Sequence, residues 1–276
     1  LMNMNENLTV LEVDGERLFT IEHLPEQSEP TKAYIFVHPF AEEKLWSHRV
    51  YVTTARAFCE QGIVVGRFDF RGHGDSDGDY DEASLERHIK DVNAVIEHIK
   101  STNPSVKDFG LLGLRLGATI ATLTALSRDD IDELILWDPV LDGDRYMQEI
   151  LRSNLASQMA IKGKVEITRD ELVEKMKSGE AVNIEGYYIN YNYFQEISSI
   201  NLLDREYPEN LSCCILQVVR NPKQPINNQY IKFSEKFSNN PTIDKAHEEQ
   251  FWKEIKSFYD RAENLLAGSL SWLESK

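Results

Sequence analysis

Residues 109–118 combine an apolar stretch, three glycines and an arginine. The segment reads Gly113-Leu-Arg-Leu-Gly117, and small residues follow it. The pattern Gly-x-Nuc-x-Gly between a strand and a helix lifts a nucleophilic side chain, Ser, Cys or Asp, on a strained turn, as acyl-transfer chemistry requires. Here the central residue is Arg115, whose guanidinium stays protonated and cannot attack a carbonyl. The segment therefore predicts the backbone of a nucleophile turn from which the nucleophile is missing.

A guanidinium at such a turn needs a partner, because an unpaired buried charge is costly. Asp138 ends the next apolar run, 134–138, at a depth where its carboxylate would face Arg115. Two interpretations stay open. Arg115 either forms an internal ion pair with Asp138, or it binds a carboxylate, phosphate or sulfate through charge-assisted hydrogen bonds. Both hold if the pair leaves part of the guanidinium free.

Other reactive residue types give weaker patterns. Gly74-Asp-Ser-Asp-Gly78 also fits the sequence pattern Gly-x-Ser-x-Gly of a nucleophile turn. It lies, however, in an acidic loop with no expected strand directly before it. Ser76 is therefore not expected to be a nucleophile. The histidines and the three cysteines lack the spacing of metal ligands, so we expect no metal site and no cofactor. Glu42 and Glu43 follow the apolar run 33–38, but the sequence does not tell which way they point.

Strands and helices that would position these residues alternate along the chain. This rhythm predicts crossover connections and a parallel sheet with helices on both faces. It breaks between about 141 and 211, which we interpret as a helical cap inserted into a core of residues 1–140 and 212–276. The expected strands are 7–13, 16–23, 33–38, 63–70, 109–114, 134–138 and 213–220, and the expected helices are about 47–61, 84–101, 116–127 and 248–274.

Composition narrows the classes of partner. The 276 residues carry a formal net charge of −16, which argues against nucleic acid and against an anionic membrane surface. No apolar run approaches the ~18 residues of a membrane span, and no leader pattern stands at the N-terminus. Three cysteines are too few for a disulfide framework. We expect a cytoplasmic protein, and its oligomeric state stays open.

Three motifs together resemble the α/β-hydrolase superfamily. They are His38-Pro-Phe40, Asp69-Phe-Arg-Gly-His-Gly-Asp-Ser76 and the turn at Arg115, each placed after an expected strand. The resemblance implies an α/β-hydrolase fold, with about eight mostly parallel strands, helices on both faces and an inserted helical cap.

A closer resemblance is to the hydrolase-like proteins associated with exosortase systems, type 2, with the nucleophilic Ser replaced by Arg115. Residues 39–44, 113–118, 137–143 and 251–255 carry it. The name of that group follows its fold and implies no demonstrated substrate.

The superfamily resemblance also assigns roles to single positions. It places the catalytic base at His247, while the segment 221–225, where the acid is expected, holds no carboxylate. A base without its nucleophile and its acid cannot run the triad mechanism, so conventional serine hydrolase activity is not expected. The oxyanion donors would be the backbone N–H groups of Phe40 and Leu116, with His38 beside them.

These residues lead to two hypotheses of different classes. In the first, the chain is a catalytically degenerate hydrolase-like protein that binds a small acidic or acyl ligand, or a partner protein, in the former active-site cleft. In the second, it is an active hydrolase or acyl transferase on esters or thioesters, in which His247 or Asp138 acts as the base without a serine nucleophile. A structural subunit with a filled cleft is a third, weaker interpretation.

Overall fold

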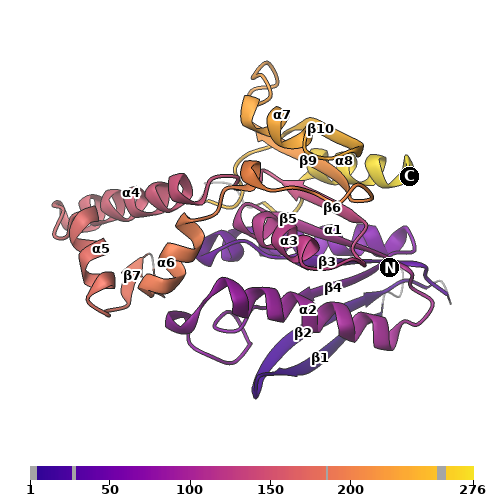
Figure 1. The fold of residues 1–276 in the computed structure, drawn as a ribbon, viewed down its shortest axis with the longest axis horizontal. Helices are drawn as coiled ribbons and strands as arrows, with labels where there is room; N and C mark the ends of the chain where they lie inside the picture. The colour runs from indigo at the N-terminus through magenta and orange to yellow at the C-terminus, as the bar shows by residue number, and fades with distance from the viewer. Residues whose placement is uncertain (1–4, 27–28, 185, 254–258) are drawn as a thin grey trace.

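The computed structural model describes residues 5–26, 29–184, 186–253 and 259–276, and an eight-stranded sheet lies at its centre (Figure 1). The strand order is β1-β2-β4-β3-β5-β6-β9-β10. The β1–β2 and β2–β4 pairs are antiparallel and the other pairs are parallel, which confirms the expected sheet. The strands are β1 (Asn5–Val13), β2 (Glu16–Leu24), β3 (Lys32–Val37), β4 (Val64–Phe68), β5 (Asp108–Leu114), β6 (Glu133–Trp137), β9 (Ser212–Val219) and β10 (Asn239–His247).

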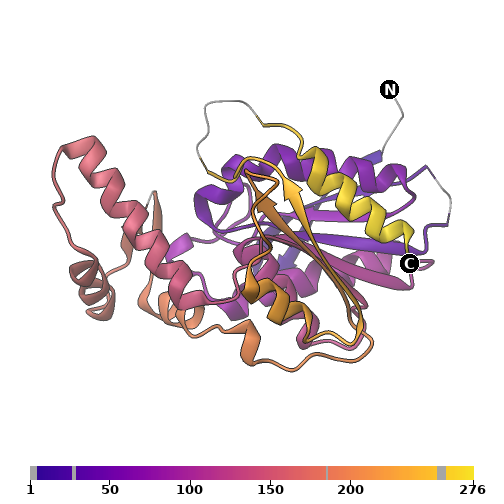
Figure 2. The ribbon, with the colours of Figure 1, turned by 90° about the horizontal axis from the view of Figure 1, so that it is seen from above.

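The central strands are continuous apolar runs because helices cover both of their faces. Alternate residues of each strand enter two separate apolar clusters, one on each side of the sheet. On one side the sheet packs against α2 (Leu85–Thr102), α3 (Leu116–Leu126) and α7 (Asn228–Ser234). On the other side it packs against α1 (Ala41–Glu60) and α8 (Glu263–Glu274) (Figures 1 and 2).

Between β6 and β9 the chain leaves the sheet and forms a cap that projects from one end of it (Figures 1 and 2). The chain enters and leaves the cap side by side, because Gly143 N–H donates to Ile200 O at 2.8 Å and Leu202 N–H donates to Leu141 O at 2.9 Å. The cap is not wholly helical, since it contains a short antiparallel pair of strands. Its elements are α4 (Gly143–Lys162), α5 (Arg169–Lys177), β7 (Val182–Ile184), β8 (Tyr187–Ile189) and α6 (Tyr191–Ser198), and short 3₁₀ turns lie at Tyr80–Glu82 and Leu202–Asp204.

The expected helix over 248–274 is wrong in its first part. Among the described residues of that segment, only Glu263–Glu274 is helical, and 254–258 lie outside the described residues. Phe251 and Trp252 are both buried, but they are not helical. They lie instead in a turn, where the Phe251 and Tyr259 rings stack at 5.4 Å between centroids.

The expected start of α1 is also wrong, because the helix begins at Ala41 rather than near residue 47. The residue before it, Phe40, has no side-chain cap, so the start carries no capping signal. β10 was not expected either, because it is a largely polar strand at the sheet edge and lacks an apolar run. In the described part of the chain, no helix is both long and apolar enough to cross a bilayer.

We predict that Gly117→Ala destabilises the protein by about 2–3 kcal/mol, because a Cβ there would lie 2.4 Å from Val37 O and 2.6 Å from His38 O. Backbone atoms cannot move aside as a flexible side chain can. The matched control is Gly268→Ala in α8, whose Cβ would meet only the side chain of Leu216, at 3.1 Å. Urea unfolding measures both variants. A loss below about 0.5 kcal/mol for Gly117→Ala would contradict the prediction.

Candidate functional site

The backbone at Arg115 has the strained geometry of a nucleophile turn. Arg115 links β5 to α3 with φ 53° and ψ −122°, a conformation that L-residues rarely adopt. Two hydrogen bonds hold it there: its N–H donates to Trp137 O at 3.0 Å, and Val140 N–H donates to Arg115 O at 3.3 Å. The expected turn is thus confirmed in its backbone, and it directs a cation to the position of a nucleophile.

Three carboxylates surround the Arg115 guanidinium. Nη1 lies 3.4 Å from Asp138 Oδ2, Nε lies 3.5 Å from Glu43 Oε1, and Nη2 lies 3.9 Å from Glu149 Oε2. These distances are long for charge-assisted hydrogen bonds, and the buried Nε–H has no acceptor in good geometry among the described residues. The expected pairing of Arg115 with Asp138 is present, but it leaves part of the guanidinium without a close partner.

Aromatic rings and further hydrogen bonds fix these groups. The Arg115 guanidinium carbon lies 5.4 Å from the Tyr146 ring centroid and 5.6 Å from that of Trp252. Tyr146 Oη donates to Glu43 Oε2 at 2.9 Å, which joins the cap helix α4 to the start of α1. Asp138 Oδ1 accepts from Val218 N–H at 3.3 Å. Both carboxylates are therefore held by contacts other than Arg115.

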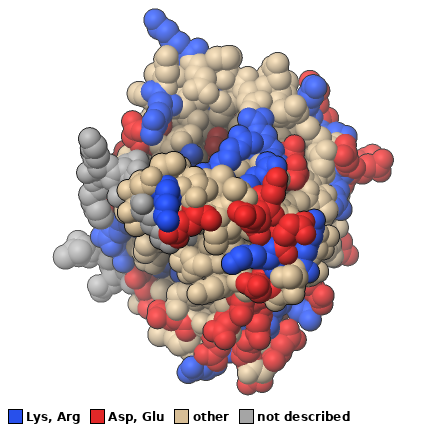
Figure 3. Space-filling view, turned by 90° about the vertical axis from the view of Figure 1, so that its left-hand side faces the viewer, with Lys and Arg blue, Asp and Glu red and all other residues tan. Residues whose placement is uncertain are grey.

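The electrostatics keep Arg115 charged. Burial alone would lower the pKa of Arg115, but the negative charges of Glu43 and Asp138 raise that pKa above its usual value. Burial raises the pKa values of Glu43 and Asp138, and Arg115 opposes this effect at both carboxyls. With three carboxylates around one guanidinium, the site has no excess positive charge. Figure 3, which views the molecule from the cap end, likewise shows more acidic than basic side chains, crowded toward the lower part of that face.

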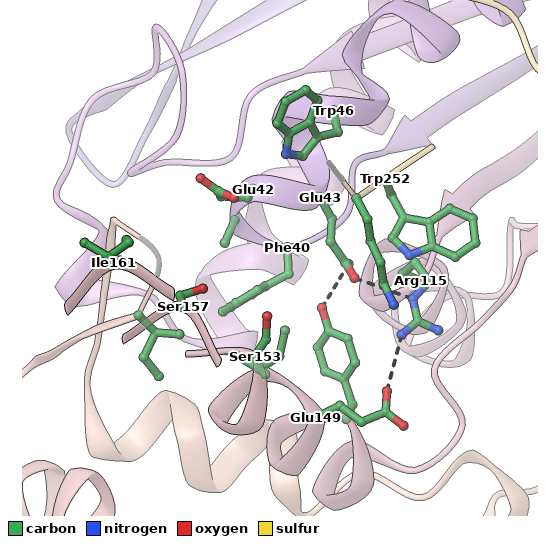
Figure 4. Close-up of a pocket in the computed structure, with 15 residues that line it drawn as sticks. Phe40, Glu42, Glu43, Trp46, Arg115, Glu149, Ser153, Ser157, Ile161 and Trp252 are labelled. Atoms are coloured by element: carbon green, nitrogen blue, oxygen red, sulfur yellow. Dashed lines mark hydrogen bonds and ion pairs between the residues drawn. The ribbon is translucent and has the colours of Figure 1, made fainter. Parts of the chain in front are cut away.

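The larger of two cavities at Arg115 has a volume of about 530 Å³ and lies between the start of α1 and one face of α4 (Figure 4). Tyr146, Ile150, Ser153, Ser157 and Ile161 line it at helical spacing. Figure 4 shows Arg115, Glu43 and Glu149 at one end and Ile161 and Ser157 at the other. The remaining lining residues are Phe40, Ala41, Glu42, Trp46, Ile184, Trp252 and Lys253. The cavity is therefore elongated and has a mixed lining, with aromatic and aliphatic side chains beside five charged ones, of which Arg115, Glu43 and Glu149 lie at one end.

The smaller cavity has a volume of about 260 Å³ and shares Arg115, Tyr146 and Glu149 with the larger one. Its other walls come from the residues after β6, the segment between β9 and α7, and the start of α7. Asp138 and Tyr230 line it, and Tyr230 Oη donates to Pro139 O at 3.0 Å. Arg115 thus borders two cavities whose linings differ.

The structure brings only some of the expected site residues together. Phe40 lines the larger cavity, whereas Leu116 is buried in the first turn of α3 and lines neither one. Within the described residues, neither Phe40 N–H nor Leu116 N–H donates to a protein acceptor. Both amides therefore keep the free donor that an oxyanion site needs.

The two expected histidines have other partners. His38 is buried, and its Nδ1 lies 2.8 Å from Pro39 O while its Nε2 accepts from Phe70 N–H at 3.1 Å. Burial holds the pKa of His38 well below its usual value, so the ring is neutral and ties two loops together. His247 is exposed at the end of β10, with Nε2 3.0 Å from Arg220 O, and it lines neither cavity.

Sequence reasoning did not assign Glu43, Tyr146 or Glu149 to the site. Glu43 follows the segment 38–40 directly and lies in the acidic first turn of α1. Tyr146 and Glu149 lie on α4, at a spacing that places them one turn apart on a helix. The acidic first turn of α1 and the spacing of Tyr146 and Glu149 are visible in the sequence. Assigning these residues to the site also requires the position of the cap above the sheet.

The sheet, the strained turn after β5 and the cap above it define an α/β-hydrolase fold. The chain belongs to the family described as serine aminopeptidase S33, whose model matches residues 28–188, more than half of its length. It differs from a serine enzyme at the turn itself, where Arg115 stands.

Solved structures show the same fold at low sequence identity. Est1E from Butyrivibrio proteoclasticus, solved with ferulic acid bound, has a TM-score of 0.70 and 20% identity, over 96% of this chain and 98% of that one. The α/β hydrolase GrgF from Penicillium sp. sh18 has a TM-score of 0.66 and 18% identity, over 98% of both chains. Mouse alpha/beta hydrolase domain-containing protein 10 has a TM-score of 0.60 and 14% identity, over 98% of this chain and 99% of that one.

A relative by sequence is the protein of Rickettsia prowazekii (strain Madrid E) named uncharacterized protein RP471. It is 26% identical over 110 residues, which are 40% of this chain and 45% of that protein. The matched segment thus spans less than half of the relative. The solved structures support the fold, and the chemistry is argued from the site.

We predict that Arg115→Met lowers the free energy of unfolding at pH 7 by about 3–5 kcal/mol, because it leaves buried carboxylates without their cation. Without Arg115, the folded-state pKa values of Glu43 and Asp138 lie further above their unfolded values. The stabilising contribution of such a group is complete below its unfolded pKa and is lost as the pH rises through its folded pKa. The deficit should therefore be smaller at pH 5 than at pH 7.

Urea unfolding at the two pH values measures this difference against wild type. The control is Arg56→Met, which removes a cation that pairs with Glu6 at 2.6 Å in an exposed setting and should cost less than about 1 kcal/mol at both pH values. An equal deficit for Arg115→Met at pH 5 and pH 7 would show that the carboxylates do not depend on it.

Proposed function

We propose that this chain is a non-catalytic member of its family that binds an elongated acyl-type ligand in the larger cavity. The single observation behind this proposal is the combination of a cavity of about 530 Å³, partly lined by aromatic and aliphatic side chains, with a guanidinium at the turn after β5. Burying an alkyl chain against such a lining is favourable by about 0.8 kcal/mol per methylene group. The ligand would enter the cavity without meeting a group that attacks it.

The lining indicates how the ligand would lie. Ser153 and Ser157 are small residues on the cavity face of α4, and they leave room for a chain that runs along the helix toward Ile161. The polar end of the ligand would lie at Arg115, where the guanidinium and the Phe40 N–H would donate to a carbonyl oxygen. An ester, thioester or amide carbonyl fits this end of the cavity.

The carboxylates favour a neutral ligand over an acidic one. A ligand carboxylate at Arg115 would lie close to Glu43, Asp138 and Glu149, which already surround the guanidinium. Like charges at such short range in a buried site oppose binding. Of the two ligand classes suggested by the sequence, we therefore propose the acyl ligand.

The missing reactive groups argue against turnover. Arg115 cannot act as a nucleophile, and no histidine among the described residues lines either cavity. A carbonyl bound at Arg115 would thus be polarised but not cleaved by the triad route. We therefore propose binding without hydrolysis at this site.

We predict that straight-chain primary amides bind with a Kd that falls about fourfold per methylene group from hexanamide to octanamide, as the burial of each methylene group requires. Ser157→Phe should fill the cavity and weaken octanamide binding at least tenfold. The matched control is Ala156→Phe, an exposed neighbour on α4 that does not line the cavity. Isothermal titration measures all three proteins. Equal affinity for both amides, or an unchanged Kd for Ser157→Phe, would count against the proposal.

One observation favours a second candidate function, an active hydrolase with a carboxyl group as the base. Glu43 lines the larger cavity, burial raises its pKa, and Tyr146 Oη orients its carboxyl group. A carboxyl with a raised pKa in a cavity is a candidate general base for a water molecule. In this candidate, Arg115 would stabilise the developing oxyanion.

An assay with p-nitrophenyl octanoate separates the two functions. Binding without turnover is expected from the non-catalytic protein. Turnover that is abolished in Glu43→Gln, without labelling of any serine by a fluorophosphonate, would replace the first proposal by the second. The thermal stability of Glu43→Gln must match that of wild type for this comparison to hold.

A further inference from the structure

The smaller cavity is unusually rich in carboxamide side chains. Five of its lining residues are of this type, and they come from β9, from the segment before α7, from α7 and from the turn after β10. They are Gln217, Gln224, Asn227, Gln229 and Gln250. The lining of the larger cavity contains no carboxamide among its described residues. The two cavities therefore suit different chemical groups.

Hydrogen bonds fix part of this lining in place. Gln217 is buried, and its Oε1 accepts from Asn227 N–H at 2.7 Å. Asn227 Oδ1 in turn accepts from Gln229 N–H at 2.9 Å, which caps α7. Because the two carbonyl oxygens are used in this way, Gln217 and Asn227 retain their NH₂ groups as donors. The segment that carries the carboxamides is thus ordered by its own side chains.

Charged residues add both kinds of hydrogen-bonding group. Arg115 and Arg145 supply donors, and Asp138, Asp142 and Glu149 supply acceptors. Arg145 and Glu149 lie 3.4 Å apart, so neither presents an isolated charge to a ligand. A hydroxyl group both donates and accepts hydrogen bonds, and it can therefore pair with any of these charged or carboxamide side chains. A ligand anion would face three carboxylates, and a ligand cation would face two arginines.

We propose that the smaller cavity binds a neutral, polyhydroxylated headgroup of the size of a single sugar ring. This inference rests on the proposed function, because it extends the acyl ligand of the larger cavity into the smaller one. Arg115, Tyr146 and Glu149 line both cavities, so the bond between chain and headgroup would lie beside them. The ligand class is then a neutral amphiphile that carries hydroxyl groups at one end and an alkyl or acyl chain at the other.

Three probes with the same eight-carbon chain test this inference: octyl glucoside, octanamide and octyl sulfate, each below its critical micelle concentration. Isothermal titration with the full chain should give a Kd for octyl glucoside at least tenfold below that for octanamide, and octyl sulfate should bind most weakly. Gln229→Leu/Gln250→Leu should raise the Kd for octyl glucoside to the level of octanamide and leave the Kd for octanamide unchanged. The control is Gln195→Leu, an exposed residue of α6 that lines neither cavity.

Each result decides between the proposals. Equal affinity for octyl glucoside and octanamide, or tighter binding of octyl sulfate, overturns the headgroup inference and leaves the acyl-binding proposal intact. Failure of all three probes to bind overturns both. If octyl glucoside binds more tightly than octanamide and the double variant does not reduce that preference, the headgroup lies elsewhere and the assignment of this cavity is wrong.

Discussion

The charge of Arg115 and the carboxylates that surround it are the constraint on which the site depends. Glu43 comes from the start of α1, Asp138 from the end of β6 and Glu149 from the cap helix α4. One guanidinium therefore ties both faces of the core and the cap to the turn after β5. Taking so many charges out of water is costly unless they are paired, so each group requires the others. The same arrangement sets the charge that a ligand may carry.

The glycines of the turn after β5 show what the backbone requires at this place, whichever residue lies between them. Gly113 faces the backbone of Gly117 and Ala118, and Gly117 faces the carbonyl oxygens at the end of β3. These contacts are needed for α3 to pack against the sheet, whatever residue occupies the position between them. The motif is therefore a requirement of packing as much as of catalysis, and the family membership of the chain says little by itself about turnover.

The turn at Arg115 and its nearness to Asp138 could be predicted from the sequence, because they depend on local sterics and on which strands are neighbours. The turn at Arg115 follows from the spacing of its glycines, and the nearness of Asp138 follows because β5 and β6 are neighbours whose ends meet at one edge. Glu43 was not assigned because α1 begins without a capping side chain, so its first turn resembled a loop. The two cavities and the part of α4 that lines them depend on how the cap sits above the sheet, which no local pattern encodes. The segment at Phe251 and Trp252 was predicted as part of a helix from its apolar side chains. Their burial in a turn is likewise a tertiary effect.

The close spacing of the two chain segments at the base of the cap has a consequence for how such a protein changes over generations. The hydrogen bonds from Gly143 to Ile200 and from Leu202 to Leu141 close the cap into a loop whose ends meet. Insertions, deletions or wholesale replacement between those ends leave the register of β6 and β9 untouched. The part of the cavity lining that α4 provides can thus change in sequence, while the core that holds Arg115 stays the same. The cap can therefore change in length without altering the sheet, provided that Tyr146 and Glu149 keep their contacts with Glu43 and Arg115.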